Sequence, residues 1–511
     1  MSTTTQTTTT PIAHERVGWR AWAALAVLML PVLLVSIDNT ILNFALPAIA
    51  RDLEPTAAEQ LWIIDAYSLV LAGLLVTMGS FGDRFGRRRL LLIGAVGFTA
   101  VSVLAAFAPT AGWLIAARAG MGLFGATLMP STMSLLRSIF PNRDQRRIAV
   151  AVWAGMFSAG GALGPIVGGF LIEHFPWQSV FLLAVPMLVL LLVLAPFLVA
   201  ESRDPHPGRI DVASIVLSML ALGPVAYGIK EIAVHGAAGV LPLAIGGMFG
   251  WLFVRRQRRM AQPMLDMSLF RRAAFSGSLL VNLFSVIAMV GFLYFVSQHL
   301  QMIVGLSPIE AGLALLPGAV TSIAGGFAVT PIARRVRASV VIPVALVLSF
   351  AAYLIVAFAG AHDVGMLVVG FALLGAGIGA AETVSGELIL ANAPVEKAGA
   401  ASAVSETAYE LGAVLGTSIL GGILTAWYRG ALVVPDGVPA ELAAHAQETL
   451  AGAVNAAQTI GGTTGDALQA AAAAAFDGGV TVTSLIGAGL VVLAMAIAAT
   501  TLGGRRDRAP R

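Results

Sequence analysis

The sequence contains no cysteine, and only 11% of its 511 residues are charged. Without cysteine the chain can form neither disulfides nor cysteine-ligated iron–sulfur clusters, and it can carry out no thiol chemistry. Soluble domains contain roughly 25% charged residues, so a chain that is 58% hydrophobic could not keep its apolar surface away from water. These shortages exclude a soluble globular protein and indicate one that lies in a lipid bilayer.

The sequence also lacks the common patterns of enzymes and of nucleic-acid-binding proteins. Its seven histidines have no metal-ligand spacing, and no phosphate-binding loop of the GxxxxGK[ST] type is present. The net charge of +3 is carried by loops, without a basic helix that would indicate nucleic acid. We therefore expect no enzyme activity, no cofactor, no bound metal, no direct use of ATP and no nucleic-acid partner.

Long apolar runs recur along the whole chain. A run of about 20 residues can cross a hydrocarbon core of roughly 30 Å as a helix. The sequence therefore predicts an all-α polytopic membrane protein. Its fourteen predicted spans lie near residues 20–46, 60–81, 90–108, 112–136, 147–171, 178–199, 211–232, 238–254, 274–300, 310–331, 339–360, 364–391, 399–425 and 478–503.

The arginines predict the orientation of these spans. They cluster after the second, fourth, eighth and tenth spans and at the C-terminus, whereas loops after odd-numbered spans contain few basic residues. An excess of Lys and Arg marks the cytoplasmic side. We expect both termini to be cytoplasmic, with a disordered tail at residues 1–18 and a short tail at 504–511. Lys230, by the seventh span, is counted among the few bases on the external side.

A weak internal repeat indicates two halves. The arginine-rich sequences after the second and tenth spans occupy similar places, and such repeats are common in transporters whose substrate sites lie between the halves. We predict an N-terminal six-helix bundle at residues 19–200, two inserted helices at 201–260 and a C-terminal six-helix bundle at 261–503. The long external loop 428–477 either holds one or two amphipathic helices over the outer mouth or is a tolerated insertion.

GSFGDRFGRRR, which begins at residue 79, is the most specific motif. Its glycines allow a tight turn and close helix contact, while its charged residues can form a network at the cytoplasmic surface. The alternative is an ordinary positively charged loop that only sets the topology. The residues of interest in this motif are Gly79, Asp83, Arg84, Gly86, Arg87 and Arg88.

The fifth span contains the motif GGALGPIVGG. Small residues let helices approach closely, and a proline permits a bend because it removes a backbone hydrogen bond. Generic glycine-rich packing is the alternative to a functional motif. The residues of interest are Gly160, Gly164, Pro165, Gly168 and Gly169.

Ionisable side chains inside the spans are the remaining functional signal. Such groups are costly in a bilayer and mark pathways for substrates or protons. They are Asp38, Asp65, Arg118, Glu382, Glu387, Glu406 and Glu410. Glu406 and Glu410 share a helix face, where two like charges repel and the pair can hold one shared proton. Arg118 needs an acidic partner, in an ion pair that serves either structure alone or transport.

Together these residues resemble the major facilitator superfamily, and more narrowly its fourteen-helix drug:proton antiporter branch. GSFGDRFGRR resembles the superfamily's loop signature, GGALGPIVGG its antiporter motif, and IDNTILNFALP the first-helix signature of the branch. LWIIDAYSLVLAG and SAVSETAYELGAVLG are similar to sequences of the QacA-like multidrug pumps. The resemblance implies two six-helix bundles plus two inserted helices, which work by alternating access.

The resemblance also implies roles for individual residues. It assigns proton coupling to Asp38, Asp65, Arg118, Glu406 and Glu410. It also implies that the motif that begins at Gly79 is a conformational latch, formed by Gly79, Asp83, Arg84, Gly86, Arg87 and Arg88. An aromatic face attracts a cation by roughly 0.5–2 kcal/mol, although plain helix packing is the alternative for most aromatic residues. The expected substrate-binding residues are Asp38, Asn39, Trp62, Asp65, Tyr67, Trp153, Met156, Phe157, Glu382, Glu406, Tyr409 and Glu410.

The function implied is a proton-coupled multidrug efflux antiporter in a bacterial plasma membrane. Its partners would be protons, the lipid bilayer and small lipophilic cations such as quaternary ammonium compounds, dyes and fluoroquinolones, and we expect a monomer. One alternative is a proton-coupled exporter of a single metabolite or antibiotic. An uptake symporter with the same fold is another.

Overall fold

The chain is helical throughout the part that the structure describes, without a β-strand. The computed structural model describes residues 18–203, 211–260, 263, 265–358, 363–393 and 398–503. The predicted terminal tails, residues 1–18 and 504–511, lie outside the described residues apart from Gly18. Helices satisfy their own backbone hydrogen bonds, which a bilayer requires of any spanning segment.

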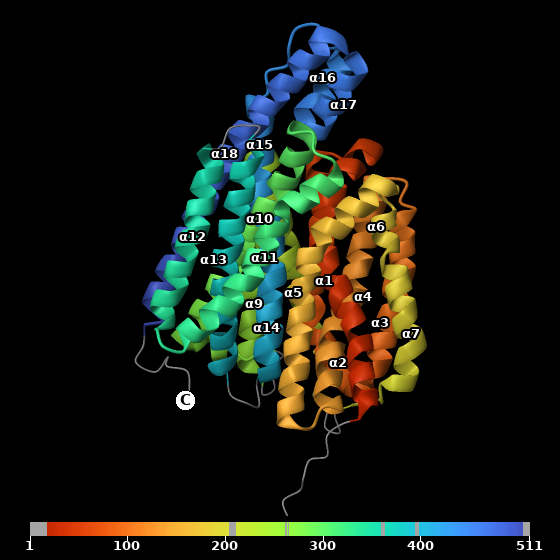
Figure 1. The fold of residues 1–511 in the computed structure, drawn as a ribbon, viewed down its shortest axis with the longest axis vertical. Helices are drawn as coiled ribbons and strands as arrows, with labels where there is room; N and C mark the ends of the chain where they lie inside the picture. The colour runs from red at the N-terminus through yellow and green to blue at the C-terminus, as the bar shows by residue number, and fades with distance from the viewer. Residues whose placement is uncertain are drawn as a thin grey trace, which may run out of the picture.

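The helices follow one another with short connections (Figure 1). The first half contains α1 (Trp19–Leu53), α2 (Ala57–Phe85), α3 (Arg87–Ala106), α4 (Ala111–Ile139), α5 (Arg143–His174), α6 (Ser179–Leu182) and α7 (Ala184–Leu198). The next two helices are α8 (Val212–His235) and α9 (Val240–Arg259). The second half contains α10 (Ala273–Gln298), α11 (Pro308–Ala333), α12 (Ala338–Phe358), α13 (Val364–Ala391), α14 (Ala398–Gly416), α15 (Gly422–Ala431), α16 (Ala440–Glu448), α17 (Leu450–Ile460) and α18 (Gly462–Thr501).

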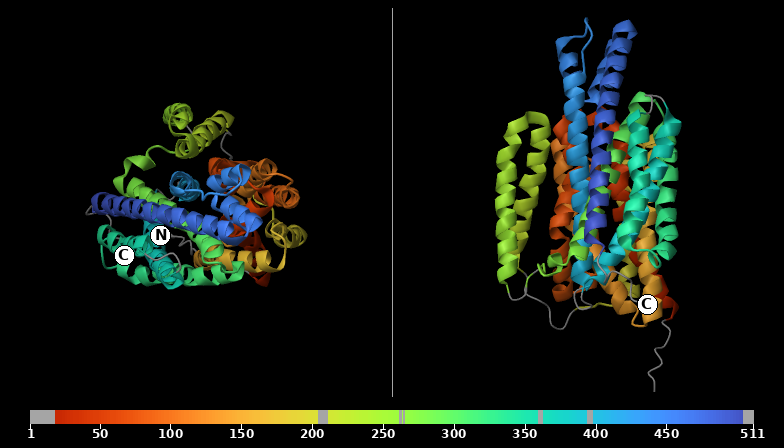
Figure 2. Two further views of the ribbon diagram at one scale, coloured as in Figure 1. Left: turned by 90° about the horizontal axis from the view of Figure 1, so that it is seen from above. Right: turned by 90° about the vertical axis from the view of Figure 1, so that its left-hand side faces the viewer.

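Fourteen segments of the described residues are long and apolar enough to cross a membrane, which confirms the predicted fold class. α6 and α7 together form the sixth span, and α14, a π-helical turn η5 (Thr417–Gly421) and α15 form the thirteenth. Spans α1, α2 and α10 are among the most buried, whereas α8 and α9 are the least buried. The α8–α9 pair therefore lies at the periphery, and Figure 2 shows it to one side of the other helices.

Local sequence explains where several helices begin. Thr56 and Ser307 each form a capping box with a glutamate three residues later, and these boxes start α2 and α11. α2 and α3 are separated by Gly86 alone, whose φ of +111° favours glycine because it has no Cβ. The turn between α2 and α3 is therefore encoded by one residue of the predicted latch.

The two halves are joined at one end of the molecule. We call the end that carries residues 84–89 and 334–337 the arginine-rich end. The hydrogen bonds between described residues of the two halves lie near the middle of the spans or at the opposite end. At that opposite end, the backbone nitrogen of Ile309 in α11 donates to Glu173 of α5 at 3.2 Å. The structure is therefore closed opposite the arginine-rich end.

The segment 428–477 contains α16, α17 and the beginning of α18. The α16–α17 pair projects beyond the other helices, at the end opposite the last residues of α18 (Figure 1). The hydroxyl of Tyr428 donates to the carbonyl oxygen of Ala446 at 2.9 Å. The backbone nitrogen of Ala57 in α2 donates to Glu448 at 3.4 Å. These contacts attach the pair to both halves at the closed end.

Candidate functional site

Arg118 of α4 and Asp38 of α1 form an ion pair buried between helices. Nη1 of Arg118 lies 2.9 Å and 2.7 Å from the two carboxylate oxygens, and Nε donates to the carbonyl oxygen of Ile63 at 3.2 Å. The guanidinium carbon lies 4.6 Å from the centre of the Tyr67 ring. Because the arginine side chain is only 2% exposed, it needs this acidic partner. Tyr67 is buried and packs on Arg118 in this state.

Asp65 of α2 forms a second buried ion pair, with Lys230 of α8. Nζ of Lys230 lies 2.9 Å from the carboxylate, donates to the carbonyl oxygen of Leu61 at 3.1 Å, and lies 3.8 Å from the centre of the Trp62 ring. Both charged side chains are at most 2% exposed. The prediction that counted Lys230 among external loop bases is wrong, because its long side chain is buried between α8 and α2.

The π-helical turn η5 brings the thirteenth span to Asp65. The hydroxyl of Ser418 in this turn donates to the Asp65 carboxylate at 3.0 Å. A Cβ at Gly421 would lie only 3.0 Å from a methyl carbon of Leu61, so α2 and η5 are in close contact. π-turns change the direction of the side chains that follow them and are frequent at functional sites. η5 therefore supplies part of the environment of the second ion pair.

Three of the predicted site residues are glutamates in the spans of the second half. Glu382 of α13 and Glu406 and Glu410 of α14 form no ion pair with a described basic side chain. Glu410 is buried, and Asn39 of α1 donates to its Oε1 at 3.2 Å. Its Oε2 has no hydrogen-bond partner among the described residues. Glu410 thus places an unneutralised carboxyl group at the interface between the halves.

Three of the predicted aromatic residues form a row across this interface. The rings of Trp153 and Phe157 in α5 are stacked with centroids 6.2 Å apart, and Phe157 meets Tyr409 of α14 edge-on at 5.9 Å. The indole nitrogen of Trp153 donates to the hydroxyl of Thr132 at 3.2 Å. Met156 is partly buried against the same core. The row therefore reaches α14 at Tyr409, one residue before Glu410 in the sequence.

The fifth-span motif packs α5 closely against two other helices. Its glycines facing α1 are Gly160, Gly164 and Gly168. A Cβ at Gly164 would lie 3.2 Å from the carbonyl oxygen of Ile37, and one at Gly169 would lie 2.5 Å from that of Pro308 in α11. The carbonyl of Pro165 lies against another glycine of α11. The motif therefore joins α5 to α1 within its half and to α11 across the interface.

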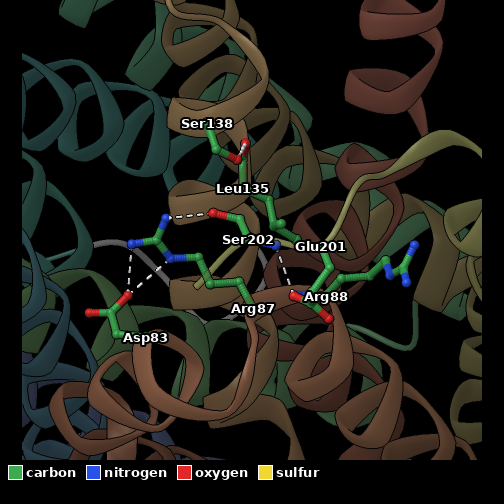
Figure 3. Close-up of polar contacts among 7 residues, drawn as sticks. All are labelled: Asp83, Arg87, Arg88, Leu135, Ser138, Glu201 and Ser202. Carbon is green, nitrogen blue, oxygen red and sulfur yellow. Dashed lines mark hydrogen bonds and ion pairs between the residues drawn. The ribbon is translucent and has the colours of Figure 1, made fainter. Parts of the chain in front are cut away.

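The predicted latch residues surround the start of α3. Asp83 accepts hydrogen bonds from Nη2 and Nε of Arg87 at 2.8 Å and 2.9 Å, and Nη1 of Arg87 donates to Ser202 at 3.1 Å (Figure 3). The Glu201 carboxylate accepts from the backbone nitrogen of Arg88 at 3.0 Å and from that of the next residue at 3.1 Å. An acid at a helix N-terminus satisfies free N–H groups and the helix dipole. Glu201 is therefore the N-terminal cap of α3.

Glycine is required at one position of this latch. A Cβ at Gly86 would lie 2.9 Å from the carboxyl carbon of Glu201, so a larger residue would displace the cap. Gly79 faces Pro130 of α4 with more space, at 3.8 Å, and Arg84 is exposed. The contacts among Asp83, the arginines and the cap all lie within the first half. In this state the latch fastens the sixth span to α3.

Three residues of these clusters are not among the site residues predicted from the sequence: Lys230, Glu201 and Ser418. Lys230 lay inside its own predicted span, and a lone base in an apolar segment was a signal of an acidic partner. Glu201 follows directly after the apolar run of the sixth span, next to an arginine-rich loop, which was a weaker signal. No local signal pointed to Ser418, because a π-turn has no sequence signature. Within the described residues, no group of three or more His, Asp or Glu could hold a metal ion.

Comparison with known proteins agrees with these features. A profile of the Major Facilitator Superfamily matches residues 28–417. The multidrug efflux pump LfrA of Mycolicibacterium smegmatis is 53% identical over 485 residues, which cover 94% of this chain and 96% of LfrA. The methyl viologen resistance protein SmvA of Salmonella typhimurium is 35% identical over 463 residues, or 90% of this chain and 93% of SmvA.

More distant relatives extend the comparison. The tetracenomycin C resistance and export protein of Streptomyces glaucescens is 30% identical over 530 aligned positions, with coverage of 100% of this chain and 98% of that protein. An inward-facing crystal structure of a bacterial homologue of the human lysosomal transporter Spinster has the same fold, with a TM-score of 0.69 at 17% identity. That alignment covers 96% of this chain and 100% of the other. This chain is a multi-pass membrane protein that belongs to the Major Facilitator Superfamily.

Proposed function

We propose that the protein is a proton-coupled multidrug efflux antiporter of the bacterial plasma membrane, which exports lipophilic, mainly cationic compounds. Relatives with matching length are a multidrug efflux pump and a methyl viologen resistance protein. The observation that carries the proposal is Glu410, a buried carboxyl group between the halves with one oxygen free of hydrogen bonds. On α14 it follows directly after Tyr409, at which the aromatic row ends.

This arrangement suits the exchange of a cation for a proton. An ionised carboxylate buried without a basic partner is unstable, so Glu410 should bind either a cation or a proton. A lipophilic cation can place its charge at Glu410 and its apolar body against Tyr409, Phe157 and Trp153, whose faces attract cations. A proton that arrives from the other side neutralises the carboxylate and releases the cation. Binding of the two is then mutually exclusive, which is the requirement for antiport.

The first ion pair links this exchange to α1. Asn39, which donates to Glu410, is the neighbour of Asp38, whose carboxylate holds Arg118. A change of charge at Glu410 alters the amide contact and so the position of α1. Protonation of Asp38 would release Arg118 in turn. In this mechanism the carboxyl groups at 38 and 410 respond to each other through the adjacent residues 38 and 39 of α1.

Alternating access follows from the way the halves are joined. The positive-inside rule puts the arginine-rich end and both termini in the cytoplasm. The closed end is then external, and the present arrangement would receive a substrate from the cytoplasm or the inner leaflet. Opening outward requires α5 and α11 to separate near Gly169 and the cytoplasmic ends to close, where the latch would hold the outward-open state. The protein acts as a monomer without a cofactor, driven by the proton gradient.

Transport by the purified protein tests this proposal. Proteoliposomes that contain the full chain should export ethidium when a pH gradient is imposed without ATP, and a protonophore should stop the export. Glu410→Gln, which keeps the size of the side chain and removes its charge, is the matched control and should fail to couple. Export that continues unchanged in the presence of the protonophore would rule out an antiporter.

A narrower function has some support as well. The tetracenomycin C resistance and export protein is named for one compound and aligns with the whole chain at 30% identity. A single-metabolite exporter would use the same fold and coupling. Resistance of an efflux-deficient host to a panel of dyes, quaternary ammonium compounds, biguanides and fluoroquinolones separates the two functions. A broad pump protects against several classes, and a dedicated exporter against at most one.

A further inference from the structure

Lys230 is a buried base contributed by a peripheral helix. Its ammonium group contacts the Asp65 carboxylate at 2.9 Å, the carbonyl oxygen of Leu61 at 3.1 Å and the Trp62 ring at 3.8 Å. A carboxylate, a carbonyl oxygen and an aromatic face are the groups that recognise an organic cation. These three groups therefore form a complete cation-binding subsite, and the ammonium group of Lys230 occupies it.

The aromatic side of this subsite reaches the surface between α2 and α8. Trp62 stacks on Tyr227 of α8 with ring centroids 6.4 Å apart, and Tyr227 is 45% exposed. On the other side, Ser418 of η5 donates to Asp65. Three different spans thus form the subsite, and one of them belongs to the α8–α9 pair. α8 therefore supplies the cation of this subsite, in addition to packing at the periphery of the bundle.

The thirteenth span connects the subsite to Glu410. Ser418, which contacts Asp65, is eight residues beyond Glu410 along this span, which corresponds to a rise of about 12 Å along the helix axis at 1.5 Å per residue. Of these two carboxyl groups, that of Glu410 has no basic partner among the described residues and that of Asp65 is already neutralised by Lys230.

We propose that Lys230 is a resident cation that determines substrate charge selectivity. A singly charged substrate uses Glu410 and leaves Lys230 in place. A substrate with two positive charges about 12 Å apart must displace Lys230 from Asp65 before both of its charges are neutralised. Lys230 thus disfavours long dications. The inference rests on the proposed export function, because it assumes that the carboxyl group of Glu410 receives the first charge.

Two substitutions at Lys230 should change dication binding in opposite directions. Lys230→Met keeps the length of the side chain and leaves Asp65 free, and a new charge-assisted contact should tighten dication binding about tenfold. Lys230→Arg keeps the charge, but a guanidinium can hold a carboxylate by two parallel hydrogen bonds and is harder to displace. Arg should therefore weaken dication binding. Binding of a monocation should change in neither variant.

The experiment measures binding to the purified full-length protein in detergent micelles by calorimetry. Decamethonium, a bisquaternary chain, is the dication, and tetraphenylphosphonium is the monocation. Decamethonium affinity should follow the order Lys230→Met, wild type, Lys230→Arg, while tetraphenylphosphonium affinity stays constant. The double variant Asp65→Asn/Lys230→Met removes both charges and should lose the gain for decamethonium.

Any other order of decamethonium affinity overturns the proposal, as does an equal change for both probes. If Lys230→Met does not fold, the comparison of wild type with Lys230→Arg decides alone, and equal decamethonium affinities refute displacement. Ethidium export by wild-type proteoliposomes separates this inference from the function it rests on. Wild type that exports ethidium without the predicted order refutes only the role of Lys230, whereas wild type that fails to export or bind cations refutes the proposed function itself.

Discussion

Replacing Asp38 with Asn removes the charge that balances Arg118 without changing the size of the side chain. Both carboxylate oxygens lie within 2.9 Å of Nη1, and the guanidinium side chain is 2% exposed. Removal of one partner from a buried ion pair costs about 3–5 kcal/mol, because the other charge is left uncompensated. The contacts of Arg118 with the carbonyl oxygen of Ile63 and the Tyr67 ring do not involve Asp38, so they should persist in the variant.

Stability and transport should respond differently to this change. We expect Asp38→Asn to lower the melting temperature by several degrees, while the protein still reaches the membrane, and to abolish ethidium export. Asp38→Glu keeps the charge with a shifted geometry and should retain part of the export. Asp38→Asn/Arg118→Gln removes both charges and should recover most of the stability but none of the export, because the carboxyl group is absent.

Three measurements check this prediction. Abundance in the membrane, thermal unfolding followed by tryptophan fluorescence of the purified protein, and ethidium efflux from proteoliposomes are compared for the wild type and the three variants. An unchanged melting temperature in Asp38→Asn would show that Arg118 does not depend on this carboxylate. Normal export by Asp38→Asn under the same pH gradient would show that Asp38 has only a structural role.

Four further predictions follow from other contacts. Asp83→Asn should shift the balance between inward- and outward-open states with the fold intact, and single cysteines introduced into the cysteine-free chain should show altered labelling at the two mouths; identical labelling with full transport would reduce the latch to a topology signal. Gly164→Ala should cost about 1–3 kcal/mol because the new methyl group is overpacked against α1, and normal thermal unfolding would contradict this close packing. Hydrogen bonds from Arg256 lower the pKa of Asp211 to about 2, so Asp211→Asn should lower the melting temperature at pH 7. The difference in melting temperature between wild type and Asp211→Asn should shrink as pH falls from about 4 towards 2, because Asp211 takes up a proton in the unfolded wild type at a higher pH than in the folded protein. A difference that does not depend on pH would exclude the ion pair. Glu410→Gln should still bind neutral dyes but lose the competition between ethidium and protons, and ethidium affinity that rises with pH in this variant as it does in wild type would place the exchange elsewhere.

Much of the fold could be read from the sequence because the signals are local. An apolar run long enough to cross a bilayer must be helical, and arginines at alternate ends set the expected topology. The glycines at 160, 164 and 168 recur on one helix face, so their close contact with another helix could be anticipated, as could the need of Arg118 for an acidic partner. The positions of the carboxyl groups within the spans also followed from the sequence, because the limits of each apolar run show which residues lie inside it.

Only the tertiary structure decided which groups meet. Arg118 pairs with Asp38, which lies 80 residues away along the chain, and the Lys230 side chain contacts a backbone carbonyl 169 residues away. Such pairs depend on how separate helices pack and rotate, and spacing along the chain contains no information about that. The π-turn that brings Ser418 to Asp65 and the capping of α3 by Glu201 have the same origin. The sequence therefore determined which ionisable groups lie in the membrane, and helix packing determined which of them are neutralised and which remain free for a substrate or a proton.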